Sequence, residues 1–175
     1  MTPATPAFPE NGYGIAKLAA GALSRLAAQQ LGMRHIWVRV LSVYGPFDGE
    51  NSMITSTLRR FLRGEQPQFT KGEQLWDYLY SEDAGDAFYL VGEKATGHKV
   101  YCLGSGESRT LKSYIEDIRD EVSPDAVLGF GEIPYASQAP MHLCADIRTL
   151  REDTGFAPKI SFREGIRQTI RWMQG

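Results

Sequence analysis

The sequence is poor in cysteine, has no long apolar run and carries no excess of charge of either sign. Its two cysteines, Cys102 and Cys144, lie far apart and form no CxxC pair, which argues against a disulfide scaffold or a zinc site. No apolar run approaches the length of a membrane span. The 19 Lys and Arg residues offset 21 Asp and Glu residues without forming a basic block, so neither nucleic acid nor a membrane surface is expected as a partner.

The start of the chain lacks the charged and apolar regions of a signal peptide. Together with the unpaired thiols, this absence predicts a cytoplasmic protein. The three histidines stand at no metal-ligand spacing, so no metal site is predicted. A chain of 175 residues with 42% hydrophobic content is expected to form a single domain over 1–175. Residues 1–12, which hold three prolines, are expected to be an extended lead-in.

Hydrophobic periodicity along the chain predicts helices that alternate with strands, which is typical of the α/β class. Ser81 and Asp146 are predicted to cap helices, and Ser161 with Glu164 forms a capping box before the last helix. The segment 35–43 is apolar on both faces, which favours a strand inside a parallel sheet. The predicted helices cover 13–30, 52–63, 83–92, 110–121, 146–155 and a stretch from 162, and the predicted strands cover 35–43, two segments within 68–80, 99–103 and 127–130.

Tyr13 and Lys17 stand four residues apart at the start of the first predicted helix, so their side chains are expected to lie on one face. A phenol is a poor base at neutral pH, and a fixed cation beside it favours the phenolate, which can then exchange a proton with an alcohol or ketone. The alternative is a chance pair of surface neighbours, which this composition also allows.

Five motifs follow one another in a recognisable order along the chain. They are the Tyr-x-x-x-Lys pair with the segment 38–46 (VRVLSVYGP), then 75–87 (LWDYLYSEDAGDA), 101–106 (YCLGSG), 145–148 (ADIR) and 154–156 (TGF). In this order and at these separations they resemble the C-terminal half of the extended short-chain dehydrogenase/reductase family, the NAD-dependent nucleotide-sugar epimerases and dehydratases. The resemblance covers almost the whole chain.

The resemblance implies a partial Rossmann-type fold, namely the C-terminal part of a doubly wound parallel sheet, with a small α/β substrate-binding lobe. It implies that Tyr13 is the acid/base and that Lys17 favours its phenolate and holds the nicotinamide ribose of NAD. The residues implied beside the cofactor or a nucleotide-sugar-like substrate lie at strand ends, where ligands of open α/β sheets bind. For the cofactor these are Tyr13, Lys17, Val40, Leu41 and Ser42, and for the substrate Ser42, Val43, Tyr44, Leu75 and Asp77.

The sequence also departs from this family. The glycine-rich dinucleotide fingerprint is absent, and the segment 104–106 (GSG) is predicted to be an ordinary loop after a strand. The serine or threonine that completes the catalytic set is absent as well. Ser42 replaces an asparagine common in the family, Trp76 replaces an arginine, and no diphosphate-binding arginine precedes Ala145.

These features predict the C-terminal portion of an NAD-dependent sugar epimerase or dehydratase that is inactive alone and does not bind NAD by itself. Two alternatives stay open, a non-catalytic binding or interaction module and one half of a split two-chain enzyme. The strand 35–43 can find only one neighbour, 99–103, within this chain, so one of its edges is expected to be unpaired. A homodimer, or a complex with a cofactor-binding half, is therefore expected.

Overall fold

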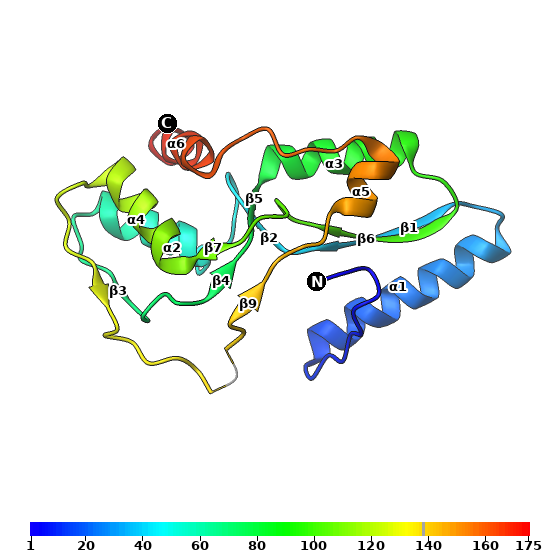
Figure 1. The fold of residues 1–175 in the computed structure, drawn as a ribbon, viewed down its shortest axis with the longest axis horizontal. Helices are drawn as coiled ribbons and strands as arrows, with labels where there is room; N and C mark the ends of the chain where they lie inside the picture. The colour runs from blue at the N-terminus through cyan, green and yellow to red at the C-terminus, as the bar shows by residue number, and fades with distance from the viewer. Residues whose placement is uncertain (138) are drawn as a thin grey trace.

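The computed structural model describes residues 1–137 and 139–175 (Figure 1). Residues 1–11 form no helix or strand. The helices are α1 (Gly12–Gln30), α2 (Met53–Leu62), α3 (Ser81–Lys94), α4 (Leu111–Val122), α5 (Arg148–Thr154) and α6 (Phe162–Gln174). The strands are β1 (His35–Val40), β2 (Ser42–Tyr44), β3 (Gln68–Phe69), β4 (Leu75–Trp76), β5 (Tyr78–Tyr80), β6 (His98–Leu103), β7 (Arg109–Thr110), β8 (Gly129–Phe130) and β9 (His142–Leu143).

Strands β1 and β6 form the longest pair, and they run parallel with His35 opposite His98 and Val40 opposite Leu103. Helix α1 lies along one side of this pair, and α3 and α5 lie on the other (Figure 1). Parallel strands with helices on both faces are the Rossmann-type arrangement. The α/β class and the parallel pairing of these two segments are thereby confirmed.

The predicted single strand over 35–43 is wrong, because the chain changes partner at Leu41. The Leu41 N–H still donates to Leu103 O at 2.9 Å, but the next three residues pair with β5 instead of β6. Ser42 then lies opposite Tyr78, and Tyr44 opposite Tyr80. After this change of partner the chain enters the part of the molecule formed by β2, β5, α2, α4 and α6. This part is called the second lobe below.

The segment 75–80 is likewise two strands with different partners. Strand β4 pairs with β7 and β9, whereas β5 pairs with β2. Asp77 lies between them and is fully buried. Leu79 and Tyr80 are both buried, so burial does not alternate along β5.

Two clusters of buried side chains form the core. The first surrounds β6 and joins it to α3 and α5; it includes Val91, Tyr101, Leu103, Leu150 and Phe156. The second joins β2 and β5 to α2, α4 and α6; it includes Tyr44, Leu58, Phe61, Ile118 and Ile166. The two clusters correspond to the two ends of the molecule in Figure 1.

The helix ends follow local sequence signals in most cases. The side chain of Ser52 accepts from the Thr55 N–H, and that of Ser161 accepts from the Glu164 N–H, as N-caps do. The predicted cap at Ser81 is wrong, since Ser81 is the first helical residue and Tyr80 occupies the cap position without a side-chain bond. Asp146 stands one residue before the cap position of α5, although its carboxylate accepts from the Arg148 N–H at 3.1 Å.

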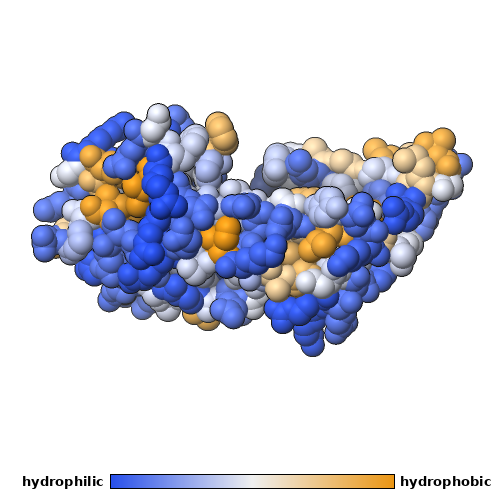
Figure 2. Space-filling view, turned by 90° about the horizontal axis from the view of Figure 1, so that it is seen from above, coloured by the Kyte–Doolittle hydropathy of each residue, from blue (hydrophilic) through white to orange (hydrophobic). Residues whose placement is uncertain are grey.

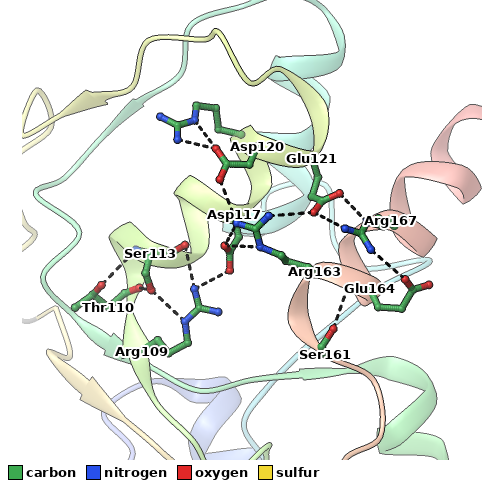
Figure 3. Close-up of polar contacts among 11 residues, drawn as sticks. Arg109, Thr110, Ser113, Asp117, Asp120, Glu121, Ser161, Arg163, Glu164 and Arg167 are labelled. Atoms are coloured by element: carbon green, nitrogen blue, oxygen red, sulfur yellow. Dashed lines mark hydrogen bonds and ion pairs between the residues drawn. The ribbon is translucent and has the colours of Figure 1, made fainter.

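An ion-pair network fastens α6 to α4 in the second lobe (Figure 3). Arg163 Nε donates to Asp117 Oδ1 at 2.9 Å, and its Nη2 lies 3.1 Å from Asp120 Oδ2. Arg167 Nε donates to Glu121 Oε2 at 2.7 Å. Because Asp117 and Glu121 are largely shielded from water, these pairs are less screened than ordinary surface pairs. The network thus holds the last helix against α4.

Candidate functional site

Helix α1 brings the Tyr-x-x-x-Lys pair together. The Asn11 side chain accepts from the Gly14 N–H at 2.8 Å and caps the helix one residue before it begins. Helical spacing then places Lys17 Nζ 5.5 Å from the centre of the Tyr13 ring. The Tyr13 side chain is 74% exposed, so its hydroxyl is open to solvent or to a ligand.

The end of β1 and the start of α1 share an open groove. It is lined by Lys17, Val40, Leu41 and Ser42 together with the N-terminal segment around Phe8, and its volume is about 610 Å³. Four of the five residues predicted to lie beside a cofactor therefore line one groove at the carboxyl end of a parallel strand. Tyr13 is not among the lining residues.

Ser42 and Trp76, two positions where the sequence departs from the family pattern, contact each other beside this groove. The indole Nε1 of Trp76 donates to the Ser42 hydroxyl at 2.7 Å. The Ser42 oxygen thus already has one donor from within the chain. Leu75, the neighbour of Trp76, is 39% exposed, and its N–H donates to Met141 O at 2.9 Å. The strand ends of β2, β4 and β9 are therefore joined beside the groove.

Tyr44 is not among the residues that line the strand-end groove, and its predicted contact with a substrate stays a prediction. Its side chain is 2% exposed, and its hydroxyl donates to Phe162 O at 3.0 Å. Burial raises the pKa of this phenol above its ordinary value. Val43 packs against the first core cluster. Tyr44 therefore acts as a core residue that contacts the start of α6.

The Asp77 carboxylate is held by four hydrogen bonds within the chain, and its predicted contact with a substrate stays a prediction. Its carboxylate accepts from the Ser105 N–H at 2.7 Å, the Ser105 hydroxyl at 2.6 Å, the Gly106 N–H at 3.2 Å and the Ala145 N–H at 2.9 Å. A Cβ at Gly104 would come within 2.5 Å of Asp77 Oδ2, so the loop approaches the carboxylate closely only because glycine stands there. The segment 104–106 is the predicted loop after a strand, and its backbone also holds the Asp77 carboxylate.

Much of the apolar face of α1 is uncovered. Leu18, Leu23 and Leu26 are between 45% and 65% exposed. Strand β1 pairs with β6 along one edge, and along its other edge it pairs with no strand of the described part of the chain. Figure 2 shows apolar side chains in separate patches, one of them at the end of the molecule where α1 ends. None of the helices described is long and apolar enough to cross a membrane.

Comparison with known proteins identifies the family. The model of the NAD dependent epimerase/dehydratase family matches residues 1–104, which is more than half of the chain. The chain belongs to this family. The resemblance found in the sequence motifs is confirmed, and so is the partial Rossmann-type fold.

The curated relatives match almost the whole chain but are about twice as long. The dTDP-glucose 4,6-dehydratase of Salmonella typhimurium is 28% identical and is matched by 98% of this chain over 50% of its own length. The dTDP-4-dehydro-6-deoxyglucose reductase of Escherichia coli is 30% identical and is matched by 94% of this chain over 52% of its length. The chain thus spans about half the length of these relatives.

Two solved structures also superpose on almost the whole chain over about half of their own length. UDP-glucose 4-epimerase of Thermotoga maritima, solved with UDP-glucose, superposes with a TM-score of 0.85 at 27% identity, over 95% of this chain and 54% of its own. The dTDP-glucose 4,6-dehydratase of Bacillus anthracis, solved with NAD, has a TM-score of 0.82 at 21% identity, over 99% of this chain and 55% of its own.

We predict that replacing Tyr13 with Phe leaves the fold intact, because the exposed hydroxyl donates to no core group. The free energy of unfolding in urea should change by less than about 0.5 kcal/mol. The matched control is Tyr44→Phe, which removes the hydrogen bond from the buried Tyr44 hydroxyl to the Phe162 carbonyl and should cost about 1 kcal/mol. A loss from Tyr13→Phe as large as that of the control would indicate a structural role for the pair.

Proposed function

We propose that this chain is the C-terminal, substrate-binding portion of an NAD-dependent sugar epimerase or dehydratase and that it carries the Tyr-x-x-x-Lys pair of the active site. Residues 1–175 act as one cytoplasmic domain, with residues 1–12 as its lead-in. The observation that carries the proposal is the groove at the end of β1, which brings Lys17 together with Val40, Leu41 and Ser42.

In this proposal Tyr13 is the acid/base that transfers the proton, and Lys17 assists it from the next turn of α1. The Lys17 ammonium lies 5.5 Å from the centre of the Tyr13 ring. The Tyr13 oxygen takes up the proton of a sugar hydroxyl while the hydride on the same carbon leaves. NAD, when bound, supplies the acceptor for that hydride. The substrate is a nucleotide-sugar-like molecule, as in the Thermotoga maritima epimerase solved with UDP-glucose.

The residues present fit only the nicotinamide end of NAD. Lys17 offers an ammonium to a ribose hydroxyl, and Val40 and Leu41 offer an apolar wall. The sequence contains no glycine-rich turn that leads into a helix and could hold a pyrophosphate. We therefore propose that the isolated chain is inactive and that the contacts to the pyrophosphate of NAD come from a second, cofactor-binding half.

We predict that the isolated chain shows no measurable binding of NAD by titration calorimetry. The full-length Bacillus anthracis dehydratase, which was solved with NAD, serves as the positive control. Adding a separately produced glycine-rich half of the same family should restore binding if the chain is half of a split enzyme. Micromolar affinity of the chain alone for NAD would contradict the assignment of the dinucleotide site to another half.

The alternative of a non-catalytic binding or interaction module makes a different prediction. Such a module would bind a nucleotide sugar unaided and would gain no NAD binding from an added half. The free edge of β1 and the uncovered face of α1 favour the two-half arrangement, because both are surfaces that a second polypeptide would cover.

We predict that the purified chain alone forms a two-fold homodimer, since an uncovered apolar surface closes most simply on a second copy. Light scattering on dilute protein should give twice the chain mass. Leu23→Glu places a charge on the exposed face of α1 and should shift the protein to monomer. A wild-type monomer that stays in solution at high concentration would contradict this assignment of the free surface.

A further inference from the structure

Helix α1 contacts the rest of the chain along a narrow stripe of small residues. Gly14, Gly21 and Ala28 recur at a spacing that places them on one face of the helix. A Cβ at Gly21 would come within 2.9 Å of the Trp37 ring, so the middle of α1 lies directly against β1. Ala28 is the one buried residue of α1, a helix that the structure describes in full. The middle and the end of the helix are therefore held by the sheet.

The start of α1, which carries Tyr13 and Lys17, has a different support. A Cβ at Gly14 would come within 2.7 Å of Pro9 Cβ, so the first turn lies directly on the segment that leads into it. Tyr13 and Lys17 are themselves exposed, so their side chains do not fasten this turn to the sheet. The position of the first turn therefore depends on where residues 1–9 lie.

Residues 1–9, called the N-terminal strap below, cross the end of β1 and are tied to the chain at two backbone carbonyl groups (Figure 1). Arg39 Nη1 donates to Thr5 O at 2.7 Å, and the Asp146 N–H donates to Met1 O at 2.7 Å. Arg39 is half-buried near the end of β1, and a hydrogen bond from a guanidinium is stronger than one between neutral groups. The Arg39 side chain thus fastens the strap to β1.

The strap is stiff between Thr5 and the start of α1. Pro6 and Pro9 have fixed φ angles, and the residues before them, Thr5 and Phe8, are restricted to extended backbone. A shift at Thr5 is therefore passed on to Pro9 and from there to the first turn of α1. The strap also forms one wall of the strand-end groove.

We propose that Arg39 is a positioning residue of the strand-end groove. Through Thr5 it holds the strap at the end of β1, and through the strap it sets how close Lys17 stands to Ser42. Arg39 also lines this groove, with its guanidinium turned to the strap. In this we rely on the function proposed above only for the roles of Tyr13 and Lys17.

A cross-link between Lys17 and position 42 measures this placement without any ligand. In Ser42→Cys, a short amine-to-thiol reagent should join the two side chains, and mass spectrometry separates this product from reaction at Cys144. Adding Arg39→Ala should lower the yield at least about threefold, because the strap loses a charge-assisted hydrogen bond. Arg39→Lys keeps a cationic donor for the Thr5 carbonyl and should restore most of the yield.

Two further variants separate positioning from a general loss of structure. Arg34→Ala removes an arginine just before β1 that donates to Ala95 O at 2.8 Å, and it should leave the yield unchanged. Pro6→Gly with Pro9→Gly loosens the strap while keeping Arg39, and it should lower the yield as Arg39→Ala does. In Arg39→Ala and in the double glycine variant, hydrogen exchange should quicken in the first turns of α1 and stay unchanged in its last turn.

Three results would overturn the proposal. They are an unchanged cross-link yield in Arg39→Ala, an equal loss of yield in Arg34→Ala, and faster exchange along the whole of α1, which would make Arg39 a residue of general stability. An unchanged yield in the double glycine variant, or no cross-link in Ser42→Cys itself, would also contradict it. None of these results depends on NAD, so the NAD titration tests the proposed function separately.

Discussion

The buried carboxylate of Asp77 is the interaction on which the arrangement of strand ends depends. It lies between β4 and β5 and receives donors from the loop after β6 and from the segment between β9 and α5, through Ser105, Gly106 and Ala145. A fully buried carboxylate is costly unless its oxygens are hydrogen-bonded, and here three N–H groups and one hydroxyl serve them. The same contact sets where β4 and β9 lie relative to the end of β1.

A second buried carboxylate, that of Asp83, also joins segments that are distant in sequence. Asp83 in α3 is 2% exposed and accepts from the backbone N–H groups of Lys159 and Ile160, which fastens the segment between α5 and α6. Together the two aspartates join segments distant in sequence to the junction of the lobes. The apolar face of α1 and the free edge of β1 have no comparable partner in the described part of the chain.

Local signals in the sequence predicted the helices well, since caps such as Ser52 and Ser161 and the left-handed Gly155 act within one turn of chain. The motif order also predicted the family and the parallel pairing of β1 with β6. The roles of Asp77 and Tyr44 were not predictable, because their partners stand up to 68 and 118 residues away and only the fold brings them together. The closely spaced glycines of 104–106 were the one signal that a backbone cradle lay there.

The most direct test of this account is the stability of Asp77→Asn in urea. An amide keeps the shape but removes the charge and turns two N–H donors toward backbone N–H groups, so the free energy of unfolding should fall by about 3 kcal/mol or more. Asp86→Asn, a matched change at an exposed carboxylate paired with Lys159, should barely alter the unfolding midpoint. If Asp77→Asn were as stable as the wild-type chain, the carboxylate would not hold the strand ends together.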